Sequence, residues 1–293
     1  MSDTQCNSAC IVDGAPGRSK DIYRTYGTSA SNLVECPTCG HCKFAEPALD
    51  EDLKNYYDKE MGRKDIATDY NDANQDAVAY VFNRIQKLTG LSDMVVHDDG
   101  CGSGYIVHYL NKQGITATGT DISKSSIEAG KAIGNTKIEN ATARKFLTQH
   151  TITPNLIYLQ HVIEHFHDPI AYMKDLRRLL APKGWLAIYV PNRNYLPVLL
   201  EGFAKDNTFV YPMHLNYFTP SSLRCALHSA GFRVAHMETT ASFGFWPTMR
   251  AEVLEAFAKA YPDYTDPDEG KRIQKLKDEM KLFEIFCLAQ RLY

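Results

Sequence analysis

Three closely spaced glycines are the strongest sign of ligand binding in this 293-residue chain. Gly100, Gly102 and Gly104 follow an apolar run, and glycine lets a ligand approach the backbone closely because it has no side chain. A helix is expected to begin directly after them, with its positive end toward electron-rich groups. Asp121 follows about twenty residues later and could accept hydrogen bonds from a ribose diol. The pattern predicts a nucleoside-cofactor site.

Histidines and a glutamate follow a second apolar run. His161, Glu164 and His165 come directly after residues 156–160, and His214 lies beyond the next expected strand. An imidazole titrates near neutral pH, so each histidine could take a proton from a reacting group. A hydrogen-bonded structural role is the alternative for each of them, and it stays open.

The elements that must position these groups alternate between strands and helices. Apolar runs predict strands at residues 94–96, 116–120, 156–160 and 185–190, and periodic patterns predict helices at 69–88, 105–111, 171–180 and 220–230. Thr219 is expected to cap the last of these helices. Ligands of doubly wound α/β sheets bind beyond the carboxyl ends of the strands, where the glycines and the histidine block both lie.

Asp98 extends the glycine pattern to Asp-x-Gly-Cys-Gly-x-Gly. With this block the chain resembles class I S-adenosylmethionine (SAM)-dependent methyltransferases of the small-molecule and ubiquinone-biosynthesis type, similar to methyltransferase domain 23. The resemblance implies a Rossmann-like α/β fold with a doubly wound, mostly parallel seven-stranded sheet, and SAM as cofactor. The cofactor-binding residues that we expect are Asp98, Gly100, Cys101, Gly102, Gly104, Asp121, Ile122, Thr142, Gln160 and His161.

Two further blocks extend the resemblance. Residues 163–169 resemble the family's Leu-Glu-His-(x)3-Pro region, and residues 212–219 match its Pro-x-His-x-x-x-Phe-Ser/Thr segment, which implies a wall on the substrate side. The expected reaction moves a methyl group to O or N of a small molecule: a sugar, a polysaccharide intermediate or a secondary metabolite. His214 is the favoured base, followed by His165 and His161, and Glu164 is expected to orient or cap.

Three positions depart from the family pattern. His97 stands where the family usually has a leucine, and Asn155 stands where relatives often have an aspartate. The acidic residue that often follows the third strand is missing, so Thr142 or a backbone group is the expected substitute at the adenine. These departures keep open an alternative, a non-catalytic SAM-binding scaffold.

The first 42 residues hold five of the eight cysteines. Four thiolates would close the shell of a structural zinc, with Cys42 and His41 as spare ligands. A cluster of reduced thiols or a redox pair is the alternative. Many methyltransferases of this broad class carry a zinc ribbon ahead of the SAM domain, and residues 1–60 resemble that arrangement. The predicted zinc ligands are Cys6, Cys10, Cys36 and Cys39.

Three segments are predicted in all. A zinc-ribbon-like segment spans residues 1–60, the SAM-dependent methyltransferase domain spans 65–240, and a helical C-terminal extension spans 241–293. The extension is amphipathic and is the candidate contact for a homodimer.

The composition of the chain limits which kinds of partner it is expected to bind. The net charge of −3 and the pI near 6.4 give no general attraction to phosphate backbones, and the chain has no long basic run. No nucleic-acid partner is therefore expected, although an RNA or protein methyltransferase that uses the ribbon for recognition remains the rival function. Neither a membrane span nor a signal peptide is expected, and the predicted location is the cytoplasm.

Overall fold

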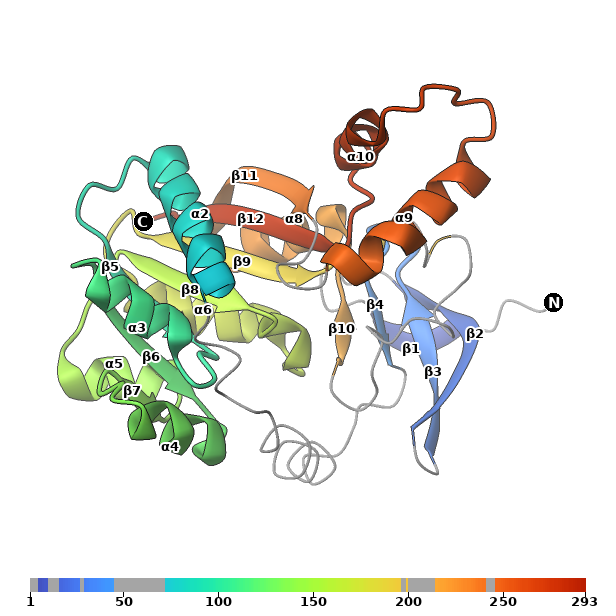
Figure 1. Ribbon diagram of the computed structural model, residues 1–293. Coiled ribbons are helices and arrows are strands. Elements are labelled where there is room, and N and C mark those ends of the chain that lie inside the picture. The colour runs from blue at the N-terminus through green and yellow to red at the C-terminus, as the bar shows by residue number, and fades with distance from the viewer. Residues whose placement is uncertain are drawn as a thin grey trace.

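A seven-stranded sheet forms the centre of the computed structural model, which describes residues 5–9, 16–26, 29–44, 72–195, 199, 214–240 and 246–293. In spatial order the strands are β11 (Phe232–Thr240), β12 (Glu284–Arg291), β9 (Trp185–Pro191), β8 (Leu156–Gln160), β5 (Val95–Asp99), β6 (Thr116–Asp121) and β7 (Ile138–Asn140) (Figure 1). Strands β9 to β7 run parallel, and β12 is antiparallel to both of its neighbours. The predicted α/β fold class is confirmed.

Helices cover both faces of this sheet (Figure 1). One face packs against α5 (Ala143–His150), α6 (Pro169–Leu179) and α8 (Pro220–Ser229), and the other packs against α2 (Asp72–Thr89), α3 (Tyr105–Lys112) and α4 (Lys124–Ala132). The side chains of β9 alternate between the two, with Leu186 and Ile188 on the α5–α6–α8 face and Trp185 and Ala187 on the α2–α3–α4 face. Among the described helices, none is long and apolar enough to cross a bilayer.

Local sequence signals explain several boundaries. The predicted cap of α8 is confirmed, because Thr219 Oγ1 accepts a hydrogen bond from Ser222 N at 3.0 Å and Ser222 Oγ accepts one from Thr219 N at 2.8 Å. The helix predicted at residues 69–88 is α2. The strand predicted at 156–160 is β8, whose apolar run is buried on both faces.

A second, antiparallel sheet holds the N-terminal part of the described chain. Its order is β1 (Gln5–Ala9), β2 (Pro16–Tyr26), β3 (Ser29–Glu35), β4 (Cys42–Phe44) and β10 (Asn216–Tyr217). Strand β10 begins two residues after His214, so this sheet is joined to the segment that carries the favoured base. Residues 1–4, 10–15, 27–28 and 45–60 of the predicted ribbon lie outside the described residues.

The prediction of a wholly helical C-terminal extension is wrong. Helices α9 (Trp246–Ala260) and α10 (Glu269–Asp278) do form there, but residues 284–291 form β12 in the main sheet. Residues 285–289 are all fully buried. A short apolar run buried on both sides has no alternation, so periodicity cannot separate such a strand from a buried helix.

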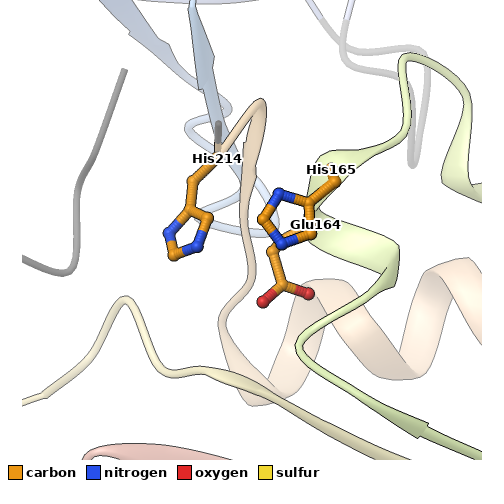
Figure 2. A group of neighbouring side chains, drawn as sticks. All are labelled: Glu164, His165 and His214. Atoms are coloured by element: carbon orange, nitrogen blue, oxygen red, sulfur yellow. The ribbon is translucent and has the colours of Figure 1, made fainter. Parts of the chain in front are cut away.

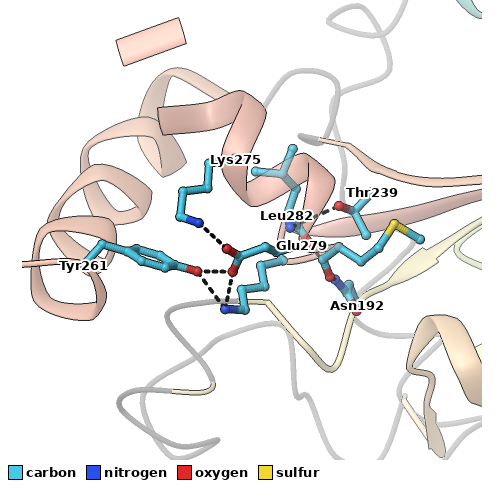
Figure 3. Close-up of polar contacts among 8 residues, drawn as sticks. Asn192, Thr239, Tyr261, Lys275, Glu279 and Leu282 are labelled. Carbon is cyan, nitrogen blue, oxygen red and sulfur yellow. Dashed lines mark hydrogen bonds and ion pairs between the residues drawn. The ribbon is translucent and has the colours of Figure 1, made fainter. Parts of the chain in front are cut away.

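Polar contacts fix α10 beside the end of β9 (Figure 3). Glu279 accepts hydrogen bonds from Tyr261 on the chain after α9 and from Lys275 and Lys281 at 2.5 and 2.6 Å. Asn192 Nδ2, just past β9, donates to the carbonyl oxygens of Met280 and Leu282 at 3.0 and 2.7 Å. These contacts guide the chain from α10 into β12.

Candidate functional site

The three glycines form a tight loop at the carboxyl end of β5. Gly100, Gly102 and Gly104 have φ values of +82°, +55° and +76°, a left-handed conformation that favours glycine. A Cβ on Gly100 would lie 2.5 Å from Val162 Cγ2, and one on Gly104 would lie 2.5 Å from Asn135 Nδ2. A Cβ on Gly102 would meet open space, so the middle of the loop is where a ligand can approach the backbone.

Asp121 ends β6 and faces this loop. Its Oδ2 accepts a hydrogen bond from Gly102 N at 2.8 Å, and its Oδ1 accepts one from Ser123 N at 2.7 Å. Each carboxylate oxygen keeps a lone pair for a ligand hydroxyl. Ile122 follows with 64% of its surface exposed, an apolar platform beside the carboxylate.

Two buried aspartates make this edge of the sheet acidic. Burial, and then the charges of Asp99 and Asp121, hold the pKa of Asp98 well above its usual range. Burial also raises the pKa of Asp99 to about 6, although hydrogen bonds from Tyr172 and Thr120 oppose the shift. A cationic ligand would relieve this crowding of negative charge.

The other predicted cofactor residues lie at the same edge. Cys101 belongs to the glycine loop and is buried, and burial raises the pKa of its thiol well above the usual range. Thr142 follows β7 and caps α5, with Oγ1 accepting a hydrogen bond from Lys145 N at 3.3 Å. Gln160 ends β8 and accepts a hydrogen bond from Tyr158 Oη at 3.0 Å.

His161 is clamped between two carboxylates. Its Nδ1 lies 3.2 Å from Glu164 Oε1, and its Nε2 lies 2.7 Å from Glu284 Oε1. Burial opposes a charge on the ring, but the hydrogen bonds and charges of the two glutamates outweigh it and raise the pKa to about 10. A protonated ring with both nitrogens engaged suits an electrostatic clamp better than a general base.

Glu164, His165 and His214 converge beside this clamp (Figure 2). One ligand atom from each lies within 4.8 Å of the others, and the two imidazole rings are 4.9 Å apart. Within the described part of the chain, these three are the one cluster of histidine, cysteine or acidic side chains close enough together to hold a metal ion. Leu215 N donates to Glu164 O at 2.8 Å and ties the segment of His214 to the block after β8.

Glu164 is fully buried and stays ionised. Burial would raise its pKa, but the hydrogen bond from His161 and the neighbouring histidines lower it to about 2. Among the described residues, nothing forms a hydrogen bond with Glu164 Oε2. The group can therefore orient an imidazole, or meet a donor on a bound molecule, through that oxygen.

An open recess adjoins the cofactor loop. Its enclosed volume is only about 20 Å³, close to the space of one water molecule, and the rest of the recess is open to solvent. Its walls come from α2, the start of α3 and the end of β8, and they are mainly apolar and aromatic. The lining residues are Ala77, Val78, Val81, Phe82, Tyr105, Ile106, Tyr158 and Gln160.

The turn of Cys36 and Cys39 contacts the start of α8, where Thr219 Oγ1 donates a hydrogen bond to Cys39 O at 2.8 Å. Cys36 and Cys39 are buried, and Gly40 N donates to Cys36 O at 2.9 Å to close the turn. The side chains of Cys6 and Cys10 lie outside the described residues, so the predicted four-thiolate set stays a prediction. Arg193 Nε donates to Cys42 Sγ at 3.4 Å, which places a cation beside that sulfur.

A family profile for the methyltransferase domain matches residues 70–237, more than half of the chain. The chain belongs to the methyltransferase domain family. The ubiquinone biosynthesis O-methyltransferase of Histophilus somni (strain 2336) is 26% identical over 156 residues, which are 46% of this chain and 66% of that protein. Its counterpart from Vibrio parahaemolyticus is 27% identical over 115 residues, which are 38% of this chain and 49% of that protein. The chain therefore spans about half to two thirds of these relatives' length.

Solved structures share the fold of this methyltransferase-family chain. The plantazolicin methyltransferase BpumL in complex with SAH superposes with a TM-score of 0.53 at 15% identity, over 82% of this chain and 94% of that one. The [4+2]-cyclase SpnF gives a TM-score of 0.53 at 14% identity, over 84% and 96%. At these identities the likeness establishes the fold alone.

Sequence reasoning missed three residues of the site. Glu284 was placed in a helical segment, and no local signal could have brought it to His161 from 123 positions away. Asp99 and Tyr172 were not singled out, although Tyr172 Oη donates to Asp99 beside the glycine loop. The sequence did offer one signal for Asp99, because it stands next to the predicted site residue Asp98.

Proposed function

We propose that the chain is a SAM-dependent methyltransferase that methylates O or N of a small-molecule acceptor. One observation carries the proposal: the glycine loop with Asp121 and the group Glu164–His165–His214 occupy the same edge of the sheet. A methyl donor and a group able to take a proton would thus lie on adjacent strand ends.

The residues at this edge fit SAM. The open space over Gly102 admits a ligand against the backbone, and Asp121 offers acceptor lone pairs to ribose hydroxyls. Ile122 offers an apolar surface to a base, while the acidic surroundings of Asp98 suit a ligand that carries a sulfonium and an ammonium. The plantazolicin methyltransferase BpumL, whose structure holds SAH, shares this fold, which adds family-level support.

The chain's own residues would orient the acceptor and move its proton. Bound SAM supplies a methyl group already activated on sulfonium sulfur, so alignment of the acceptor is the main remaining task. His214 is the proposed base, and His165 is the second candidate. Glu164, held by the His161 clamp, would orient the active imidazole and stabilise it once protonated.

The acceptor is proposed to be small and partly apolar. Aromatic and aliphatic side chains line the recess between α2 and β8, which suits a partly apolar molecule. The similarity to ubiquinone biosynthesis O-methyltransferases favours a hydroxyl acceptor. A sugar, a polysaccharide intermediate or a secondary metabolite remains within the proposal.

The first experiment identifies the product. The purified chain is incubated with cell extract and isotopically labelled SAM, and untargeted mass spectrometry searches for labelled small molecules. A new labelled metabolite supports the proposal. Label found in RNA or protein would favour the rival function with the ribbon as recognition module. SAM binding without any labelled product would favour a non-methylating role, and a cyclase of this fold makes that candidate concrete.

His214→Ala tests the base. Turnover of the identified acceptor should fall by about 100-fold or more, since general bases contribute about 10²–10⁴, while SAM affinity should change little. His228→Ala, on the last turn of α8, is the matched surface control. Near-normal turnover in His214→Ala would remove the residue from the chemistry. Loss of wild-type turnover in EDTA, restored by a divalent cation, would instead assign the group a metal.

A structural zinc at Cys6, Cys10, Cys36 and Cys39 belongs to the proposal as well. The buried turn of Cys36 and Cys39 supports it, since two thiolates on one turn form half of a tetrahedral site. Elemental analysis of tag-free protein should find about one zinc per chain. Cys36→Ser should lose the metal and Cys225→Ser, which removes an exposed thiol, should keep it. Metal-free protein after expression in zinc-supplemented medium would contradict the site.

A cytoplasmic location, the absence of a nucleic-acid partner and a homodimer contact through α9 and α10 remain predictions. Light scattering of the purified chain would measure the oligomeric state.

A further inference from the structure

A stripe of polar side chains crosses the otherwise apolar α5–α6–α8 face of the sheet. His97 and Asp99 on β5 pair in register with Thr118 and Thr120 on β6. All four are buried, and His97 and Thr120 are fully inaccessible. Burying polar groups costs free energy unless each one is hydrogen-bonded, so the stripe calls for a physical reason.

All the hydrogen bonds of the stripe point toward Asp99. Thr120 Oγ1 lies 3.0 Å from Asp99 Oδ1 and 3.1 Å from His97 Nε2. An ionised carboxylate only accepts, so the hydroxyl must give its single proton to Asp99 and accept from the Nε2–H of His97.

The hydrogen bonds at both ends of this network also point toward Asp99. Burial lowers the pKa of His97 to about 3, so the ring is neutral and its Nδ1 accepts. Thr118 Oγ1, 3.0 Å away, is then the donor to that nitrogen. At the other end, Tyr172 Oη on α6 donates to the second oxygen of Asp99. Every polar group of the stripe is satisfied in this arrangement.

Thr120 connects this network of hydrogen bonds to the glycine loop. Its carbonyl oxygen accepts hydrogen bonds from Gly100 N at 2.8 Å and Cys101 N at 3.0 Å. Asp99, which its hydroxyl holds, is the residue directly before Gly100. The main-chain carbonyl of Thr120 therefore holds Gly100 and Cys101 within the turn. The side chain of Thr120 holds Asp99, just before the turn.

We propose that the chain Thr118→His97→Thr120→Asp99←Tyr172 positions the glycine loop for SAM, with Thr120 as its hub. The inference rests on the proposed function, because SAM is the ligand of the loop. The stripe side chains lie on the opposite face from Asp98, so they act as positioning residues through the loop. A fully satisfied buried network favours one arrangement over its alternatives, which apolar packing at the same positions would not do.

A pair of variants at Thr120 tests the proposal. Thr120→Val keeps the shape and removes the hydroxyl, while Thr120→Ser keeps the hydroxyl. Calorimetric titration with SAH at pH 8 should give at least a tenfold weaker affinity for the valine variant and near wild-type affinity for the serine variant. Tyr172→Phe should weaken SAH binding in the same direction. Folded valine protein with wild-type SAH affinity, or equal losses in both variants, would overturn the proposal.

A second readout does not depend on SAH. In wild-type protein at pH 8, ¹⁵N-histidine NMR should find His97 neutral and protonated on Nε2. An Nδ1-protonated or doubly protonated ring would contradict the direction of the chain even if Thr120→Val failed to fold. If wild-type protein does not bind SAH but His97 has the expected tautomer, the proposed function fails while the hydrogen-bond chain stands without its role in positioning the cofactor loop.

Discussion

At the scale of single residues, partners decide what each ionisable group can do. His97 is fully buried and His161 is half-buried; burial lowers the pKa of His97 to about 3, whereas two glutamates raise that of His161 to about 10. The sequence places both beside the predicted site and gives no hint of this difference. His97 stands where the family usually has a leucine, and its contacts with Thr118 and Thr120 make it a hydrogen-bonded core residue.

Asp99 should make stability depend on pH. Burial raises its pKa to about 6 from 3.8, against the hydrogen bonds of Tyr172 and Thr120 and with the charge of Asp121. The folded chain then keeps a proton that the unfolded chain loses, so this group stabilises the fold less as pH rises from about 4 to 6. Relative to Asp99→Asn, wild-type protein should gain about 2 kcal/mol in unfolding free energy between pH 7 and pH 4.

Chemical denaturation at several pH values measures this difference. Asp93→Asn, which removes an exposed carboxylate before β5, is the matched control. A difference between Asp99→Asn and wild type that does not vary with pH would show that Asp99 titrates alike in both states.

At the scale of elements, strands and helices with a clear local pattern could be predicted from the sequence, and strands that depend on distant pairing partners could not. The strand at 156–160 and the cap at Thr219 match the structure because apolar runs and capping chemistry are local signals. Strand β12 was not recognised because its pairing partners, β9 and β11, lie far away in sequence. Strand β10 was also unforeseen, since it forms only when β4 is beside it.

Helix α4 should be sensitive at Gly130, where it packs on the cofactor loop. A Cβ there would lie 2.1 Å from the Ser103 carbonyl oxygen, which is backbone and cannot rotate away. Gly130→Ala should therefore lower the free energy of unfolding by about 1–3 kcal/mol, as overpacking does. Glu128→Ala, on the exposed side of the same helix, should change it by less than about 0.5 kcal/mol. Equal effects in denaturation experiments would show that α4 does not press on the loop.

At the scale of the whole molecule, the fold unites segments that the sequence separates. Cys42 and Phe44 of the N-terminal sheet pack with Val253 and Phe257 of α9 in one apolar cluster. The candidate site likewise draws on β5, β6, the block after β8, the start of β10 and β12. Local motifs predicted the contributions of β5, β6 and the block after β8. His214 was predicted from the resemblance of its segment to the family. The contribution of Glu284 depends on tertiary packing alone.

The central claim is that this edge of the sheet binds SAM, and calorimetry with Asp121→Ala tests it most directly. Wild-type protein should bind SAM at one site per chain. The alanine variant loses an acceptor for the ribose hydroxyls and should bind about tenfold to a hundredfold more weakly, as expected for hydrogen bonds to a charged group worth about 1.5–3 kcal/mol. Circular dichroism would check that the variant is folded. Wild-type affinity in a folded Asp121→Ala variant, or no SAM binding by folded wild-type protein, would contradict the account.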